Sequence, residues 1–423
     1  YQHRIQRFQS LVNQIDTIMH QTYKAELKIA EDACQRLAED VYYKTIYQVQ
    51  KQTGLGFSFS LIDDAAIKKA MSLKWYGKNY SERIWVNTDR LAEKLKEELM
   101  VNFITGRTNR EAAESVQFEF AKGMQNARRL VRTESCYLAN QMEMQSYEEC
   151  EIEKYRFVAT LDLRTSDICR ELDGKVFLVS EQQPGKNCPP MHPYCRSTTV
   201  CDIGEAELAR MARRARNPET GRTETVPANM TYKQWYDQKV KGHPDAELNE
   251  KKIKHQSADK KQYQRYKDVF KDDAPKTLDD FQNMKYGKPE KWEFVKLDYQ
   301  RRNELLQHPE RKLPNAENAI LPEPKFTKYL FDKNSKSGYP KGKAFTSRLG
   351  YDESNWKKLQ QEIRYRSTKY PAQHVDNNGY GDRYVQKMIL YGQKDTPANV
   401  VVAWIKKPDG TVGMTSAYIK EAK

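Results

Sequence analysis

The chain has 423 residues, of which 38% are hydrophobic and 31% are charged, and its formal net charge is +14. This length allows two or three domains of about 100 to 200 residues each. No apolar run approaches the roughly 18 residues that cross a bilayer, and the first residues lack the apolar segment of a signal peptide. Seven cysteines, an odd number, argue against a secreted disulfide scaffold. The composition therefore indicates a soluble, intracellular protein.

Residues 1–150 are predicted to form long helices. Apolar residues recur there at steps of three and four, and the segment TGLGFS separates a first helical block from a second. Cys34, Cys136 and Cys150 fall within these helical patterns. A free thiol in such a position usually behaves as a small buried apolar group, so we assign these three cysteines no function.

Residues 151–236 are predicted to form a small α+β module. The segments YRFVATL and KVFLV are typical of strands, and loops rich in Pro, Gly, Asn and Ser surround them. A helical patch, GEAELARMARRARN, and the segment MTYKQW follow. Residues 237–324 are dominated by Lys, Asp, Glu, Gln and Asn, with apolar residues too sparse to close a core alone, so we expect extended helices or a linker there.

Residues 325–423 are predicted to form an independent, basic α+β domain. The segment SNWKKLQQEIRYR has one apolar helical face. Three segments, DRYVQKMILYG, ANVVVAWIKK and TVGMTSAYIK, are typical of strands, and the last two flank the turn Pro408-Asp409-Gly410. The sequence as a whole thus predicts a multidomain α+β protein with a long-helical N-terminal region, a small α+β module and a C-terminal domain containing an antiparallel sheet.

The positive charge is concentrated at the C-terminal end. Residues 325–423 hold 19 Lys+Arg and 9 Asp+Glu, a net of +10 out of the total of +14. A polyanion is the natural partner for such a surface, because phosphate binding releases counterions. The alternative is a basic surface that serves only solubility.

The stretch CPPMHPYCRSTTVC gathers metal-binding residue types. Cys169, Cys188, His192 and Cys195 are the candidate ligands of a structural zinc ion, because zinc binds four sulfur or nitrogen ligands and short gaps let neighbouring side chains converge. A His-Pro turn with free thiols, redox pairing of the cysteines and a cysteine nucleophile remain alternatives.

Several spaced motifs resemble one known family. ARRLVRTE, VATLDLRTSDICRELDGKVF and PPMHPYCRSTTV closely resemble the head-morphogenesis domain of phage MuF-type minor head proteins. The matching positions are Arg132, Thr133, Glu134, Asp162, Arg164, Thr165, Cys169, Leu172, Asp173, Gly174, Pro190, His192, Pro193, Cys195 and Arg196. Ser166 and Ser197 stand where many relatives have cysteines, so two of the family's four ligands are missing, and Cys188 and Cys201 are the candidates to replace them.

This resemblance covers about residues 1–240 and implies a protein of the tailed-phage head. Such a protein is expected in the capsid interior, and in the host cytoplasm during assembly. Its expected partners are portal, capsid and scaffold proteins and the phage DNA, and its role is head assembly or DNA delivery.

The C-terminal domain contains the segments KFTKYLFDKNSKSGYPKGKAFTSRLGYDESNW, YGDRY and VVVAWIKKPDGTVGMTSAYIKE. Together they are similar to toxin modules of the barnase, EndoU, colicin and RelE-like ribonuclease superfamily. The resemblance implies metal-independent cleavage of RNA, which needs a base, an acid and positive charge on the phosphate. The candidate catalytic residues are His374, Arg383, Lys341, Lys343, Thr415 and Tyr418, with His374 expected on a flexible loop before the first strand. Two rival hypotheses are a structural DNA-binding head protein with an inactive C-terminal domain and an effector of bacterial conflict.

Overall fold

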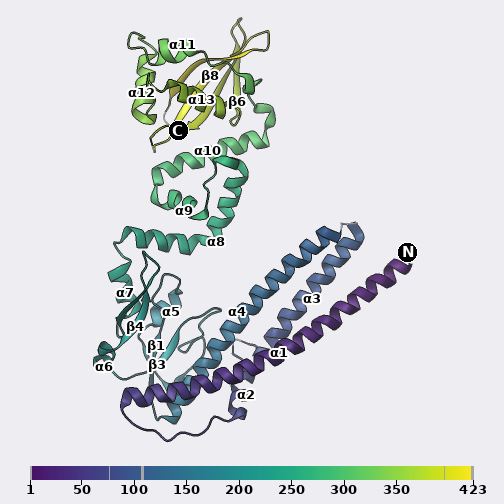
Figure 1. Cartoon of the computed structure of the whole chain (residues 1–423), viewed down its shortest axis with the longest axis vertical. Coiled ribbons are helices and arrows are strands. Elements are labelled where there is room, and N and C mark those ends of the chain that lie inside the picture. Colours follow the sequence, from purple (N-terminus) through teal and green to yellow (C-terminus); the bar gives the residue numbers. More distant parts are fainter. Residues whose placement is uncertain (1, 76, 106–108, 395, 421–423) are drawn as a thin grey trace. The chain divides into compact units, whose positions relative to one another are not determined.

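The structure is a computed structural model that describes residues 2–75, 77–105, 109–394 and 396–420 (Figure 1). The chain divides into two compact units, Tyr1–Glu247 and Leu248–Lys423. In the described part of the chain, no helix combines the length and the apolar character that crossing a membrane requires. The architecture is mostly helical at the N-terminus, with small sheets in the middle and a four-stranded antiparallel sheet at the C-terminus, as the sequence predicts. The domain boundaries at 150, 236 and 324 stay predictions.

Long helices form the first part of the N-terminal unit. They are α1 (Gln2–Thr53), α2 (Asp64–Ser72), α3 (Tyr80–Thr105) and α4 (Asn109–Glu149). Helices α1, α3 and α4 pack against one another, as Figure 1 shows. Tyr42 and Ile46 of α1 and Leu138 of α4 are almost fully buried in the shared core. The predicted long helices are therefore confirmed.

A three-stranded sheet packs against the ends of α1 and α4. Its strands are β1 (Lys154–Val158), β2 (Val176–Leu178) and β3 (Thr198–Cys201), in the antiparallel order β2-β1-β3. The short helices α5 (Asp167–Leu172) and η1 (Val179–Glu181) connect them. Tyr155 of the central strand is fully buried in the same core as Tyr42, so the sheet and the helices share one apolar interior.

The predicted helical patch GEAELARMARRARN is only partly helical. Its first half forms α6 (Glu205–Arg210), but its second half forms β4 (Ala212–Arg216), which pairs with β5 (Thr223–Pro227). The Asn217 side chain accepts hydrogen bonds from the backbone N–H groups of Glu219 and Thr220, which closes the turn between the strands. Cross-strand pairing thus overrides the helical propensity of Ala and Arg. Helix α7 (Tyr232–Lys239) follows, with a capping box at Thr231.

The charged stretch after residue 237 folds into helices with an aromatic core. The elements are α8 (Pro244–Phe270), η2 (Lys271–Asp273), α9 (Leu278–Gly287) and α10 (Pro289–Gln307). Tyr266, Phe270, Phe281, Trp292 and Val295 are buried together. Of the two expected forms, extended helices or a linker, the structure shows helices, but the expectation that apolar residues are too sparse to form a core is wrong here. A few large aromatic side chains bury enough surface to replace many aliphatic ones.

The C-terminal part of the second unit surrounds a four-stranded sheet. Its helical elements are η3 (Pro309–Arg311), η4 (Ala316–Asn318), α11 (Glu323–Lys325), η5 (Phe326–Leu330), α12 (Tyr339–Leu349) and α13 (Trp356–Ser367). The strands are β6 (Ala372–Asn377), β7 (Asp382–Leu390), β8 (Ala398–Lys406) and β9 (Val412–Ile419), in the order β6-β7-β8-β9. The three predicted strands and the hairpin turn between the last two are confirmed.

Strand β6 is the part of this sheet that sequence analysis missed. His374 was expected on a flexible loop, but it lies on β6 and pairs with Tyr384 of β7. The segment QHVDNN consists mainly of polar, turn-forming residues, so it lacks the apolar alternation of a strand. This segment is a strand because it pairs with β7, and not because its own side chains alternate.

The two faces of the sheet differ in how they are covered. On the inner face, Met388, Val402 and Met414 are buried against Phe345 of α12 and Ile363 of α13. On the outer face, the side chains that alternate with them are Arg383, Val385 and Lys387 of β7, Val401, Ala403 and Ile405 of β8, and Ser416 and Tyr418 of β9. Most of these residues are at least partly exposed, whereas Val401 and, further along the same face, Ile389 and Asn399 are buried. The part of this face around Arg383, Val385 and Lys387 is therefore accessible.

Candidate metal centre and candidate nucleic-acid interface

Three of the predicted metal ligands converge in the small α+β module. Cys169 lies on α5, while His192 and Cys195 lie in the turn that precedes β3. The Cys169 and Cys195 sulfurs are 3.8 Å apart, and the Cys169 sulfur is 3.5 Å from Nε2 of His192. All three ligand atoms lie within 4.8 Å of one another, and both cysteines are buried.

The imidazole of His192 is held in the orientation that a metal ligand needs. Its Nδ1 atom lies 2.8 Å from the carbonyl oxygen of Pro193, so Nδ1 carries the proton and donates to that oxygen. The lone pair is then on Nε2, which faces Cys169 and accepts from the Ser166 hydroxyl at 2.7 Å. A backbone carbonyl that fixes the tautomer in this way is typical of metal-binding histidines.

The two separations from the Cys169 sulfur fit the tetrahedral geometry of zinc. With bonds of about 2.3 Å to sulfur and about 2.0 Å to nitrogen, a tetrahedron places two sulfurs about 3.8 Å apart and a sulfur and a nitrogen about 3.5 Å apart. The group shows 3.8 Å and 3.5 Å for these separations. This buried Cys-His-Cys group can therefore hold a metal ion such as zinc.

The structure does not bring Cys188, the fourth predicted ligand, into this group. Cys188 is fully buried in the apolar core with Tyr155 and Tyr147, and it is not part of the group formed by Cys169, His192 and Cys195. Its sulfur contacts the carbonyl oxygen of the next residue at 3.7 Å instead. Proximity in sequence to His192 made Cys188 a candidate, but its side chain packs into a different cluster.

A cysteine from a distant helix contacts the group. Cys136 of α4 packs in the same apolar cluster as Cys169 and Cys195. Hydrogen bonds from the Cys136 thiol and then from the Cys169 thiol hold the pKa of Cys195 well below its usual range. Sequence analysis missed Cys136 because its position in a regular helix suggested only packing.

Other residues of the family pattern hold the module together. Arg196 makes a bidentate ion pair with Asp162, whose carboxylate also accepts the backbone N–H of Arg164 at 2.9 Å. Burial acts against ionisation of Asp162, but the hydrogen bonds from Arg196 outweigh it and lower the pKa of this carboxyl group. Asp173 is fully buried and accepts the backbone N–H groups of Ala159 and Tyr232 at 2.6 Å each. These carboxylates act as structural acceptors.

In the second unit, two of the predicted catalytic residues lie together at the β9 edge of the sheet. The Lys341 ammonium of α12 donates to the Tyr329 hydroxyl at 3.0 Å and to the Ser416 hydroxyl at 3.1 Å. It also lies 5.7 Å from the ring centre of Tyr418. Hydrogen bonds from Lys341 and then Ser337 lower the pKa of Tyr329. Sequence analysis did not identify Tyr329, which lies on the π-helical turn η5.

Two glycines allow this close approach of α12 to η5. A Cβ atom on Gly342 would lie 1.8 Å from the carbonyl oxygen of Leu330, and one on Gly338 would lie 2.0 Å from that of Tyr329. Neither distance is compatible with a side chain. The glycines on either side of Lys341 therefore position its ammonium group beside Tyr329.

The strand register places further cations on the same open face. Lys387 of β7 pairs with Val401 of β8, which pairs with Tyr418 of β9, so the three side chains share the outer face. Strands β7 and β9 are two strand spacings, about 10 Å, apart. No ion pair of Lys387 is found among the described residues. Arg301 of α10 reaches the same face, where it donates to Asn399 of β8 at 2.7 Å.

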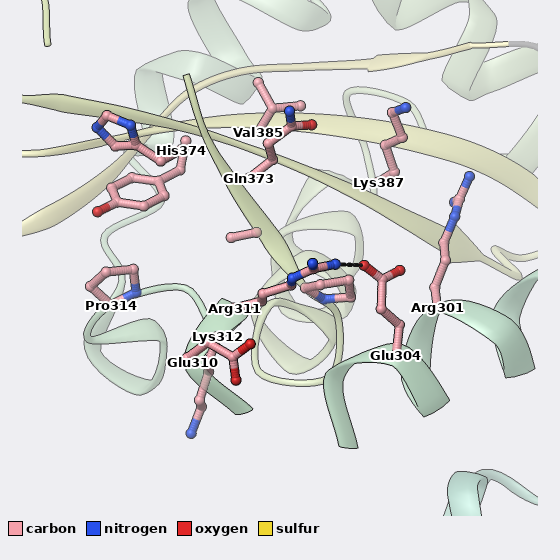
Figure 2. Close-up of a pocket in the computed structure, with 13 residues that line it drawn as sticks. Arg301, Glu304, Glu310, Arg311, Lys312, Pro314, Gln373, His374, Val385 and Lys387 are labelled. Atoms are coloured by element: carbon pink, nitrogen blue, oxygen red, sulfur yellow. Dashed lines mark hydrogen bonds and ion pairs between the residues drawn. The ribbon is translucent and has the colours of Figure 1, made fainter. Parts of the chain in front are cut away.

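A cleft with a volume of about 850 Å³ runs along the other edge of the sheet, beside β6. Figure 2 shows His374 at one end and Lys387 with Arg301 at the other, with an ion pair of Arg311 and Glu304 between them. The remaining charged side chains that line it are Glu310 and Lys312. Cations thus outnumber carboxylates here, which favours an anionic ligand.

The structure divides the predicted catalytic set. His374 lies on the edge strand β6, next to the ring of Tyr384 and 3.6 Å from a carboxylate oxygen of Asp382. Because His374 pairs with Tyr384, its side chain lies on the inner face of the sheet. Lys341 and Tyr418 lie at the opposite edge strand.

The other three predicted residues have local partners. Arg383 forms a bidentate ion pair with the exposed Asp376. Lys343 lies 5.8 Å from the ring centre of Tyr339. The Thr415 hydroxyl donates to the carbonyl oxygen of Ala403 at 3.1 Å, at a β-bulge.

Comparison with known proteins identifies two domains in the chain. Residues 93–200 match the family described as "Phage Mu protein F like protein", so this part of the chain is similar to that family. Residues 312–421 match a family described as "Domain of unknown function (DUF6883)". The second match agrees with the structure, in which Leu313 and Leu321 already pack in the core of the C-terminal sheet.

One curated protein is similar to part of this chain and has a name that states an activity. It is described as "NAD(+)--arginine ADP-ribosyltransferase EFV" from Enterococcus faecalis, and it is 25% identical over 183 residues. The matched segment covers 42% of this chain and 37% of the relative. The relative is named as an ADP-ribosyltransferase and not as a nuclease. No solved structure matches this chain.

Proposed function

We propose that this chain is a minor head protein of a tailed phage whose second unit is an RNA-cleaving effector. The Phage Mu protein F-like unit attaches it to the portal side of the capsid interior, together with capsid and scaffold proteins and DNA, and the second unit enters the host with the DNA. The single observation that carries the RNA-cleaving part is the open sheet face, where Lys387 of β7 and Tyr418 of β9 are in register across β8 and Lys341 of α12 lies beside Tyr418.

The open face suits a single-stranded polyanion. Lysine ammonium groups bind phosphates as point charges, and exposed tyrosine rings offer surfaces on which bases stack. Lys341 and Lys387 lie on opposite sides of β8, so they can contact different phosphates of one strand. The cationic cleft beside β6 extends this surface beyond the sheet edge.

The Lys341 cluster supplies the groups that metal-independent cleavage needs. The phenolate form of Tyr329, favoured by its lowered pKa, takes the proton of the 2′-hydroxyl, and the 2′-oxygen forms a bond to the adjacent phosphorus. The bond from phosphorus to the 5′-oxygen breaks, and the Tyr418 hydroxyl donates the proton to that oxygen. Lys341 balances the extra negative charge of the transition state. The products are a 2′,3′-cyclic phosphate and a 5′-hydroxyl.

His374 is the alternative proton-transfer residue. It lies at the end of the cleft beside β6, close to Asp382, which can orient its ring. In this alternative the reaction takes place at the other edge of the sheet, with Arg383 near the phosphate. The two arrangements differ in the residues that must be present for cleavage.

The Cys-His-Cys group supports a second part of the proposal. We assign it a structural zinc ion, held by Cys169, His192 and Cys195. A closed zinc site contributes directly to folding and supplies no reaction. Its place between α5 and the turn before β3 makes it a cross-link within the head-protein domain.

Incubation of the purified full chain with labelled RNA in EDTA tests the proposed activity. We expect cyclic-phosphate ends, with cleavage reduced at least about 100-fold by Lys341→Ala or Tyr329→Phe. Equal cleavage by these variants, with loss in His374→Ala, would move the reaction to the β6 edge. Binding that is sensitive to salt, without cleavage by any form, would support a structural DNA-binding protein with an inactive domain.

Two further measurements separate the remaining alternatives. Transfer of label from NAD⁺ to arginine-containing proteins, without RNA cleavage, would favour the activity named for the Enterococcus relative. Mass spectrometry of purified phage heads tests the location, because the proposal requires the chain in assembled particles. Toxicity of the expressed chain together with its absence from particles would favour an effector of bacterial conflict.

A further inference from the structure

We propose that Cys136 of α4 is the fourth ligand of the zinc site, completing a Cys₃His set with Cys169, His192 and Cys195. This inference rests on the zinc ion proposed above and is independent of the RNA-cleaving activity. It assigns a role to a residue that lies outside the cysteine-rich segment.

A fourth ligand is required because structural zinc sites are four-coordinate and closed. The converging group offers three ligands among the described residues. Ser166, whose hydroxyl donates to Nε2 of His192 at 2.7 Å, lies beside the group. A neutral serine hydroxyl is not among the usual ligands of structural zinc, which are cysteine, histidine, aspartate and glutamate. The missing ligand must therefore come from elsewhere in the fold.

Cys136 is placed to supply it. Its side chain packs against the cluster that contains Cys169, Cys195 and Met191. Its sulfur lies 3.7 Å from the carbonyl oxygen of Ser197, two residues beyond Cys195. Cys136 thus lies beside the three converged ligands, next to the turn that carries Cys195.

A neighbouring side chain supports a sulfur ligand at this position. Asn140, one helical turn after Cys136, donates through Nδ2 to the Cys136 carbonyl oxygen at 2.7 Å and lies 3.7 Å from the Cys136 sulfur. Asn140 is almost fully buried. Amide N–H groups directed at sulfur stabilise the thiolate form that binds a metal.

The proposed ligand changes what the zinc ion holds together. Cys169, His192 and Cys195 all belong to the small α+β module, whereas Cys136 belongs to the long helix α4. With Cys136 as a ligand, the metal links the helical region of the head-protein domain to its sheet.

Cobalt(II) substitution in the full chain tests this assignment, because the intensity of the sulfur-to-cobalt charge-transfer band follows the number of thiolate ligands. We expect one ion per chain in the unaltered protein. Cys136→Ser should lower the band by roughly a third and weaken zinc binding, measured against a chelator, by roughly 100-fold. The matched control is Cys150→Ser, a buried cysteine directly after the last residue of the same helix, which should change neither quantity.

A second variant covers the case in which Cys136→Ser does not fold. Cys136→His keeps a zinc-binding side chain, so it should retain zinc with the lower, two-thiolate band. If Cys136→Ser left the charge-transfer band and the zinc affinity unchanged, Cys136 would not be a ligand, but the proposed zinc ion would stand. If the unaltered chain bound no zinc or cobalt, the proposed zinc ion itself would be wrong, and the role of Cys136 with it. Neither result would bear on RNA cleavage.

Discussion

The Cys-His-Cys group and the open sheet face contrast in how the fold assembles them. The first is buried, and its three converged residues come from a short stretch of chain around α5 and the turn before β3. The second is exposed, and its residues come from α12, β7 and β9, which only strand register brings onto one face. Short sequence gaps therefore suffice to locate the residues of the Cys-His-Cys group. The residues of the open face can be located only when the strand order and the face on which each side chain lies are known.

The largest expected effect concerns the buried carboxylate that supports the Cys-His-Cys module. Asp173→Ala should lower the free energy of unfolding of the N-terminal unit by about 4 kcal/mol, because it leaves two backbone N–H groups and the Arg213 guanidinium without their acceptor. Denaturant unfolding of the full chain measures this loss. Asp167→Ala is the control, since its side chain is 89% exposed and its ion pair spans 3.8 Å, so it should change stability by less than about 0.5 kcal/mol. Equal losses in both variants would refute the structural role of Asp173.

The second prediction tests the packing of α12 on η5, which positions Lys341 at the open sheet face, by introducing a steric clash. Gly342→Ala would place a Cβ atom 1.8 Å from the carbonyl oxygen of Leu330, and α12 must shift to relieve the clash. We expect the second unit to lose about 3 kcal/mol of stability, as overpacking against backbone does. Gly410→Ala, where a Cβ meets nothing within 4 Å but the backbone has a positive φ, should cost only about 1 kcal/mol. A thermal melt that ranks the two variants in the reverse order would contradict the packing of α12 on η5.

Particular residues show how far the sequence determined each region. His192, Cys169 and Cys195 were predicted together because short gaps in a turn restrict where side chains can lie. Cys188 was predicted to join them, whereas the structure packs Cys136 of α4 beside the group, since sequence distance says nothing about which helix packs beside a turn. The strands β7, β8 and β9 were predicted from their alternation and turn residues, but β6 was not, because its polar residues give no such pattern.

The division of the predicted catalytic residues has the same cause. His374 and Tyr418 are both in the basic domain, and both carry suitable chemistry. Their separation on opposite edge strands follows from the order β6-β7-β8-β9, which composition does not encode. Lys341 and Tyr418 come together because Gly338 and Gly342 let α12 approach η5, and sequence gave no sign of that contact.

The third prediction concerns pH and the carboxylate that links η2 to α10 and α13. Asp273 accepts from Arg302 at 2.6 Å, Lys369 at 3.0 Å and Tyr365 at 2.8 Å. Burial opposes ionisation of Asp273, but these hydrogen bonds outweigh it and lower its pKa to about 2. A folded pKa below the unfolded value of about 3.9 stabilises the folded unit above that pH, and the stabilisation is lost as the pH falls toward 2.

Asp273→Asn should therefore lower the stability of the second unit by about 1 kcal/mol at pH 6, a value reduced for the 25% exposure of the side chain. The difference from the unaltered protein should shrink as the pH falls from about 5 to 2. Thermal melts across this pH range measure it, with the exposed neighbour Asp272→Asn as the control. A difference that stayed constant with pH would show that Asp273 does not act through its charge.

The smallest expected effect separates phosphate binding on the open face from the general basicity of the domain. Lys387→Ala should reduce the slope of log affinity against log salt for single-stranded RNA by about 0.7, the value for one lost phosphate contact. Lys358→Ala removes the same charge from the exposed side of α13, the helix that covers the inner face, and should leave the slope nearly unchanged. The net charge of the two variants is identical. Fluorescence anisotropy at several salt concentrations measures both, and equal slopes for the two variants would mean that RNA senses only the total charge of the domain and not this face.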